Sequence, residues 1–222
     1  TGVTMADING DGRLDIYSCR TSKTDDGLKS NFLFINMGNK TISGIPVPYF
    51  EEQSKQYGLD DNSDSNHASF FDYDRDGDLD LFILNHKIGF KDSAKFRLKE
   101  QKDGSMKRIK TPETPFESNR LYRNDGGRFT DVTAIAGLVS SAFGLSATPV
   151  DIDRDGWLDI YVANDFIEPD NVYFNNRDGT FTDHFFDYFK HTSHFSMGTD
   201  ATDFNNDGLV DIIVVDMKSG DH

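Results

Sequence analysis

The sequence predicts an all-β protein, a β-propeller of four-stranded antiparallel blades. Two observations lead to this prediction. An aspartate-rich loop of nine residues occurs four times, beginning at Asp7, Asp72, Asp151 and Asp203, and a short run of strand-forming residues follows each copy. A hairpin pattern rich in aromatic residues recurs between the copies. Because the interval between copies is long and variable, blades with insertions are favoured over a regular solenoid.

Each loop has oxygen-bearing side chains at its first, third, fifth and ninth positions and glycine at its sixth. Oxygen ligands in a flexible loop crowded with carboxylates favour calcium. We therefore predict up to four Ca2+ ions, one in each loop, with the backbone carbonyl of the seventh residue as an added ligand. The predicted metal-binding residues are Asp7, Asn9, Asp11, Arg13 and Asp15 in loop 1; Asp72, Asp74, Asp76, Asp78 and Asp80 in loop 2; Asp151, Asp153, Asp155, Trp157 and Asp159 in loop 3; and Asp203, Asn205, Asp207, Leu209 and Asp211 in loop 4.

A plain acidic turn and an EF-hand both fit the loops less well. An acidic surface turn needs no such spacing, and chance would not repeat the spacing in four places. An EF-hand needs a glutamate at the twelfth position and a helix on each side. The twelfth positions here are Ser18, Ile83, Val162 and Val214, and the residues around them are β-branched or aromatic. Each loop therefore leads into a strand, and the ninth residue stands at its start.

The repeats divide the chain into four units. Residues 1–65 form the first blade, 66–139 the second, 140–190 the third, and 191–222 the start of a fourth. In each unit, one strand leads into the loop, a second leaves it, and a hairpin completes the sheet. In the first hairpin we expect a long turn that passes through Gly44 and Pro46 before Tyr49. A shared motif, Tyr57-Gly58-Leu59 and Ala136-Gly137-Leu138, follows two of the hairpins.

Composition excludes several classes of partner and structure. The formal net charge of −15 and the pI near 4.6 argue against nucleic acid, which requires a basic face. No apolar run is long enough for a membrane-spanning helix. Cys19 is the single cysteine, so an intramolecular disulfide is impossible, and its apolar setting predicts a buried thiol. The chain looks like part of a longer propeller, whose remaining blades are then expected partners.

Histidines and a basic insertion are the remaining candidate functional features. His184, His191 and His194 lie in an aromatic stretch without a nucleophile motif, so packing between blades is favoured over catalysis. Residues 86–118 interrupt the second blade between its second and third strands. This insertion is either a solvated loop or a surface that binds an acidic partner. Its basic residues are Lys87, Lys91, Lys95, Arg97, Lys99, Lys102, Lys107, Arg108 and Lys110.

The repeats resemble FG-GAP and VCBS repeats, which form the β-propeller of integrin alpha chains and of bacterial surface proteins. The third unit shows the resemblance best, with Phe143-Gly144 and Ala147-Thr148-Pro149 before its loop, whereas the second and fourth units depart from that pattern. Asn-x-Leu-Tyr-x-Asn, Gly-Gly-x-Phe and Ala-Gly-Leu are most similar to the cartilage-acidic-protein-like group of large secreted bacterial proteins. This resemblance implies an incomplete arc of a seven-bladed ring, with calcium between the first two strands of each blade.

Two functions are consistent with this resemblance. The favoured one is a non-enzymatic, calcium-binding module that binds a protein or glycan at the cell surface or in a secreted complex, as in adhesion. The alternative is a calcium-dependent enzyme acting on glycans. No catalytic residue is assigned, because carboxylates suited to acid-base chemistry cannot be told apart from metal ligands in so acidic a chain. We expect an extracellular location or association with a bacterial outer membrane, since such loops suit the millimolar calcium found outside cells.

Overall fold

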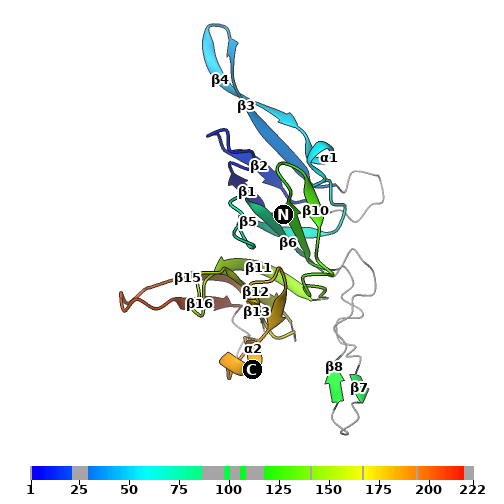
Figure 1. The fold of residues 1–222 in the computed structure, drawn as a ribbon, viewed down its shortest axis with the longest axis vertical. Coiled ribbons are helices and arrows are strands. Elements are labelled where there is room, and N and C mark those ends of the chain that lie inside the picture. Colours follow the sequence, from blue (N-terminus) through cyan, green and yellow to red (C-terminus); the bar gives the residue numbers. More distant parts are fainter. Residues whose placement is uncertain are drawn as a thin grey trace.

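A computed structural model describes residues 2–21, 30–86, 98–100, 106–108, 118–140, 142–166, 168–193 and 195–217. It confirms an all-β fold of antiparallel sheets that form an open arc (Figure 1). Three sheets have four strands each, in the orders β1-β2-β3-β4, β10-β9-β6-β5 and β11-β12-β13-β14, and we call them blades 1, 2 and 3. A two-stranded sheet, β15-β16, follows blade 3 as the start of blade 4.

The strands begin and end as follows. Blade 1 consists of β1 (Val3–Ala6), β2 (Asp15–Ser18), β3 (Phe32–Ile42) and β4 (Ile45–Glu52). Blade 2 consists of β5 (Ser65–Phe71), β6 (Asp80–Asn85), β9 (Arg120–Asn124) and β10 (Phe129–Asp131). Blade 3 consists of β11 (Phe143–Val150), β12 (Asp159–Asp165), β13 (Asn171–Asn175) and β14 (Phe181–Asp183), and blade 4 begins with β15 (Ser196–Thr202) and β16 (Asp211–Asp216).

Two short helices, α1 (Ser54–Tyr57) and α2 (Phe185–Tyr188), follow the first and third blades. In the part of the chain that the structure describes, no helix has the length and apolar character needed to cross a membrane. Within the insertion, β7 (Leu98–Glu100) and β8 (Met106–Arg108) pair as a separate small sheet. The side chains of its basic residues lie outside the described part, so the binding role predicted for them stays a prediction.

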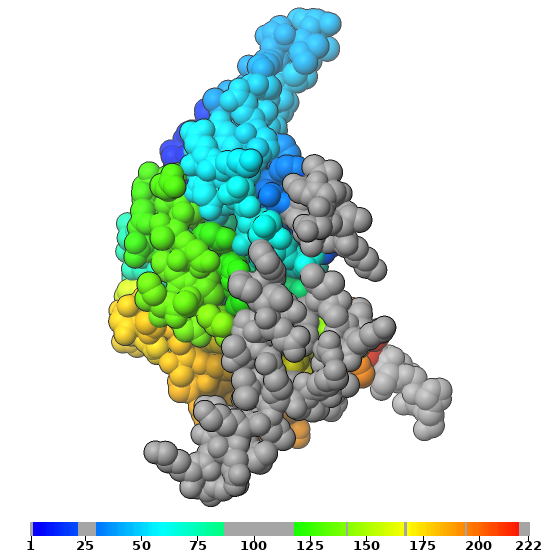
Figure 2. Space-filling model, turned by 90° about the vertical axis from the view of Figure 1, so that its right-hand side faces the viewer, coloured from blue at the N-terminus to red at the C-terminus, as the bar shows by residue number. Residues whose placement is uncertain are grey.

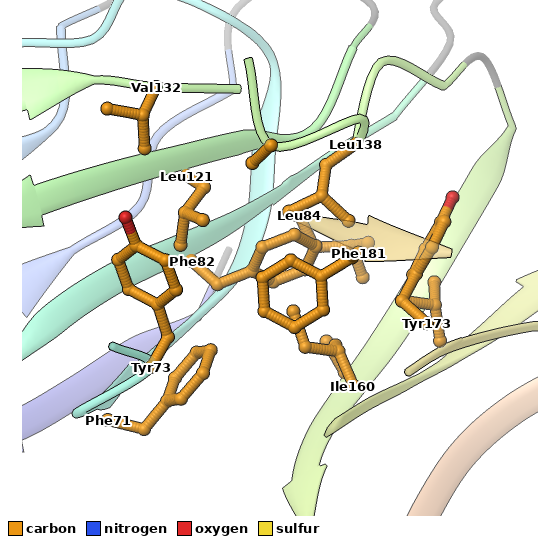
Figure 3. Packing of buried hydrophobic residues seen from close by; sticks show 13 residues of the cluster. Phe71, Tyr73, Phe82, Leu84, Leu121, Val132, Leu138, Ile160, Tyr173 and Phe181 are labelled. Carbon is orange, nitrogen blue, oxygen red and sulfur yellow. The ribbon is translucent and has the colours of Figure 1, made fainter. Parts of the chain in front are cut away.

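The core lies between the blades, because the inner strands bury both of their faces. All six residues of β6 are buried, and successive side chains point to opposite sides of the sheet. Leu81 and Ile83 pack against blade 1 in one cluster, whereas Phe82 and Leu84 pack against blade 3 in another. Figure 3 shows the second cluster, where Phe82 and Leu84 lie close to Phe181 from the outer strand of blade 3. Stacking of neighbours therefore replaces a single central core.

The recurrent glycine-leucine motif joins each blade to the next. Leu59 and Leu138 are both fully buried. A side chain at Gly58 would place a Cβ atom 2.9 Å from the carbonyl oxygen of Phe129, and one at Gly137 would come within 3.1 Å of that of Phe181. Both contacts are with the outer strand of the following blade. Glycine is required here because the backbone of one blade runs directly against that strand, and both glycines have positive φ angles.

The predicted long turn in blade 1 is wrong. The residues expected to form it belong to a long hairpin, in which β3 and β4 pair from Phe34 and Glu52 to Ile42 and Ile45. The turn itself is Ser43-Gly44, both with positive φ angles, as a two-residue hairpin turn requires. The proline that suggested a longer turn lies on β4, an edge strand that tolerates it. Figure 2 shows this hairpin projecting beyond the rest of blade 1.

The arc is open at both ends. Val3 and Met5 on β1 are 65% and 53% exposed, and Ile213 and Val215 on β16 are 46% and 56% exposed. The residues of β6 and β12 that are equivalent to those of β16 are buried because a neighbouring blade covers them. The exposure of β16 therefore follows from its place at the end of the stack and not from a different sequence pattern.

Candidate metal centres

The four aspartate-rich loops join the first and second strands of their sheets, on the same face of the arc. In each loop the carboxylate of the first aspartate accepts hydrogen bonds from backbone N–H groups of the same loop, and these bonds fix the turn. Asp7 accepts hydrogen bonds from the N–H groups of Asp11 and Gly12, at 3.0 and 2.8 Å. Asp151 and Asp203 accept the equivalent pairs of bonds in loops 3 and 4, and Asp72 accepts one from Gly77. The glycine at the sixth position has a positive φ in all four loops.

The ninth aspartate joins the loop to the sheet. Asp80 is fully buried at the start of β6 and accepts N–H bonds from Tyr73 at 3.0 Å and from Asn124 on β9 at 2.8 Å. Asp15 and Asp159, both 1% exposed, make the same two bonds in their own blades. In loop 4, Asp211 is only partly buried and accepts the N–H of Phe204. The third strand that would supply the second bond is not part of the described two-stranded sheet.

Carboxylates converge in loops 2 and 3. Oxygen atoms of the first, third and ninth aspartates lie within 4.8 Å of one another in each of these loops, as Asp72, Asp74 and Asp80, and as Asp151, Asp153 and Asp159. One oxygen of Asp72 and one of Asp74 are buried without a hydrogen-bond partner in the described structure. Buried carboxylate oxygens without donors are costly unless a cation pairs with them. This donor set therefore fits a hard metal ion, and the described residues place three of the predicted ligands at each site.

Burial makes these carboxylates difficult to ionise without a metal. Desolvation raises the pKa of Asp80 to about 7, although the N–H bonds from Asn124 and Tyr73 oppose the shift. Desolvation likewise raises the pKa of Asp159 to about 6, again against two backbone N–H bonds. The pKa of Asp74 is also raised by desolvation, with the negative charge of Asp76 as the next cause. A bound cation would remove this penalty, since it stabilises the ionised form.

The fifth residue of loop 3 already has a positive partner. Arg177, in the turn between β13 and β14, contacts the Asp155 carboxylate at 2.6 Å. Burial acts to raise the pKa of Asp155, but the N–H of Trp157 and the Arg177 guanidinium outweigh it and lower that pKa. The positive charge of Arg75 in loop 2 also lowers the pKa of Asp155. The guanidinium carbon of Arg75 lies 5.5 Å from the centre of the Trp157 ring. In loop 1, Arg13 pairs with Asp11 within the loop.

These contacts predict an order of calcium affinity. Loops 1 and 4 have Asn9 and Asn205 at the third position, so they attract a cation less than loops 2 and 3, which have carboxylates at all four side-chain ligand positions. In loop 3, Arg177 competes with the ion for Asp155, so we expect loop 2 to bind most tightly. Calorimetry should resolve at least two affinity classes. Trp157 is the single tryptophan of the chain, and its fluorescence should report loop 3 separately. Equal affinities in all four loops would contradict this order.

A polar cleft of about 540 Å³ opens on the loop face between blades 1 and 2. Its walls are loop 1, the end of α1, loop 2, and the turn between β9 and β10. Gln56, Tyr57 and Asp78 line it, and their side chains have no hydrogen-bond or ion-pair partner in the described part of the chain. Sequence reasoning missed this cleft. The signal that could have located it is the change of residue type, from loop to loop, at the fourth and seventh loop positions.

Two of the described histidines contact other residues of the fold, whereas His191 is exposed. His67 accepts the N–H of Ala147 through Nδ1 at 3.3 Å, across the boundary between blades 2 and 3. The His184 ring packs edge-on against Phe174 and contacts Asp187 at 2.7 Å. His194 lies outside the described residues.

Two sequence-based predictions of burial can be compared with the structure. Phe185 of the aromatic stretch is buried against blade 3, as predicted, whereas Phe186 is 72% exposed. Cys19 is a buried free thiol, as predicted, and desolvation raises its pKa to about 12.

Comparison with a family profile agrees with the fold. The sequence profile of the FG-GAP-like repeat family matches residues 7–83, 113–162 and 151–214. A search of curated proteins gave no match. One similar solved structure is that of an Agrocybe aegerita lectin, described by its specific recognition of non-reducing terminal N-acetylglucosamine. The two are 16% identical with a TM-score of 0.38, and the match covers 82% of this chain and 36% of the lectin chain. The family profile covers most of the chain, and this protein therefore belongs to the FG-GAP-like repeat family.

Proposed function

We propose that this chain is a calcium-binding propeller segment that acts as a non-enzymatic binding module for a protein or glycan, at a cell surface or in a secreted complex. The main support is the pair of buried, unpartnered carboxylate oxygens in loop 2, inside a cluster of three aspartates. Ca2+ is the proposed ion because the donors are all oxygen and carboxylates are crowded into a short loop that turns at glycine. Family membership supports the extracellular or outer-membrane location that the repeats predict.

We further propose that the chain forms part of a seven-bladed ring and belongs to the cartilage-acidic-protein-like group. The open arc supports the first statement, since the uncovered strands β1 and β16 have apolar side chains suited to further blades. The motif of β9 supports the second. In it, Leu121 is fully buried, and Asn119 and Asn124 are 4% and 2% exposed. Binding is preferred to catalysis because carboxylate catalysis on glycans uses a pair of acids, and of the two carboxylates that line the cleft Asp7 is a predicted metal ligand, which leaves Asp78 without a partner acid among the described lining residues.

Calorimetric titration of protein stripped with a chelator tests the calcium assignment. We expect Ca2+ to bind at up to four sites, and Mg2+ to bind more weakly, since Mg2+ requires stricter octahedral geometry and sheds its water reluctantly. Antibody labelling of intact producing cells, with and without permeabilisation, tests the location. Absence of Ca2+ binding at millimolar concentration would contradict the metal assignment, and labelling only after permeabilisation would contradict the surface location.

A further inference from the structure

The cleft between blades 1 and 2 exists because three side chains that fill the next boundary are missing from it. At the fourth loop position, loop 1 has Gly10 where loop 2 has Arg75. At the seventh position, loop 2 has Asp78 where loop 3 has Trp157. In the turn between the third and fourth strands, blade 2 has Gly126 where blade 3 has Arg177. Each is the second residue after the asparagine, Asn124 or Asn175, whose N–H bonds the ninth aspartate of the loop.

At the boundary between blades 2 and 3 the larger residues contact one another. Arg75 reaches from loop 2 over the Trp157 ring of loop 3, at 5.5 Å, and on the blade 3 side Arg177 holds Asp155 of its own blade. The side-chain amide of Asn175 also donates across this boundary to the carbonyl of Tyr73, at 2.8 Å. The equivalent amide of Asn124 donates to Leu79 of its own blade at 3.2 Å, as Asn175 does to Leu158 at 3.3 Å, but among the described residues it has no second bond across to blade 1. One boundary is thus closed by side chains, and the other is open.

The groups lining the open cleft define the chemistry of its ligand. Tyr57, which packs partly against the core between blades 1 and 2, offers the exposed part of its ring and a phenol. Gln56 offers an amide and Asp78 a carboxylate, and the glycines of the walls expose backbone groups. Such a mixture suits a ligand that is rich in hydroxyl groups and has one apolar face. Asp78, whose side chain is not a predicted metal ligand, gives the cleft a negative character, which disfavours an acidic ligand. Its volume of about 540 Å³ lies within the usual range for small-molecule sites.

We propose that this cleft is a binding site for a neutral saccharide of one or two sugar units. The proposal rests on the proposed function, since it names the ligand class of the binding module and its position between two metal loops. Tyr57 stacks on the apolar face of the sugar, and Asp78 and Gln56 bond its hydroxyl groups. Asp78 serves here through its side chain, whereas its predicted role in loop 2 uses only its backbone carbonyl.

Filling the cleft tests the proposal. Gly10→Arg and Gly126→Arg each insert the side chain that closes the neighbouring boundary. Their φ angles, 71° and 68°, match those of Arg75 and Arg177, at 61° and 62°, and a Cβ at either glycine meets no atom within 4 Å. Asn206→Arg is the matched control, because it adds the same charge at the fourth position of loop 4, where φ is 60°, outside the cleft.

The full chain is tested in Ca2+ by ligand-detected NMR with glucose, galactose, mannose, N-acetylglucosamine and their disaccharides. Trilysine and a sulfated disaccharide serve as charged comparators. We expect at least one neutral saccharide to bind wild type and Asn206→Arg, and its affinity to fall at least tenfold in both filling variants, whose melting temperatures stay near that of wild type. Binding of no neutral saccharide, equal binding by the filling variants, or preference for either charged probe would overturn the proposal. Calcium calorimetry on the same samples shows separately whether the metal assignment holds.

Discussion

Replacing Asp80 with alanine is expected to lower the free energy of unfolding by about 2 to 6 kcal/mol, even without calcium. The carboxylate is fully buried and accepts the N–H groups of Tyr73 and Asn124, from two different parts of blade 2. Alanine leaves both donors buried without a partner, at a cost of about 1 to 3 kcal/mol each. Unfolding by urea in the presence of a chelator measures this effect without any contribution from metal.

Asp211→Ala is the matched control for Asp80→Ala. It removes the ninth residue of loop 4, which is only partly buried and holds the N–H of Phe204 at 3.1 Å. Because water can replace this bond, we expect a loss of at most about 1 kcal/mol. A loss for Asp80→Ala as small as that for Asp211→Ala would show that the ninth aspartate does not organise the sheet.

Calcium is expected to raise the melting temperature by about 10 to 20 °C at pH 8. At a free concentration about 100 times the dissociation constant, each occupied site adds about 2.7 kcal/mol to stability. Loops 2 and 3 together would then add about 5 kcal/mol, and in a chain of this size each 1 kcal/mol raises the melting temperature by about 2 to 4 °C. Thermal unfolding followed by circular dichroism, with calcium or with chelator, measures the difference.

The calcium effect should grow as the pH rises. Desolvation raises the pKa of Asp80 to about 7 and that of Asp159 to about 6, from an ordinary value of 3.8. These acids hold their protons more tightly in the folded than in the unfolded protein, so the metal-free form loses stability between about pH 4 and pH 7. Calcium requires the ionised form, so its stabilisation is complete above about pH 7 and is lost as the pH falls through the folded pKa values.

The difference in melting temperature between calcium and chelator should therefore be small at pH 5 and largest at pH 8. Asp80→Asn provides a check, because it abolishes the titration and weakens loop 2 as a metal site. In this variant the metal-free protein should lose less stability on going from pH 5 to pH 8 than wild type does. A calcium effect of the same size at both pH values would contradict the role of these buried acids.

Local sequence patterns predicted the blades because each strand depends mainly on residues close to it. The apolar run along β6 predicts two buried faces, and the structure buries Leu81 and Phe82 on opposite sides of one sheet. The hairpin of blade 1 could not be predicted in the same way. Pro46 and Pro48 normally interrupt strands, and only their place on the edge strand β4, where no neighbour needs their N–H groups, makes the long hairpin possible.

The repeated unit and the candidate ligands can be read from the sequence, because a metal loop is built from residues within nine positions of one another. Three features could be found only in the folded chain: which of the candidate metal-binding carboxylates are buried, which of them pair with an arginine, and where a cleft has room for a bound molecule. Arg177 meets Asp155 from another strand, and the cleft opens where Gly10 and Gly126 from different blades line the same space. Such distances depend on how neighbouring blades stack, and the order of residues along the chain does not specify them.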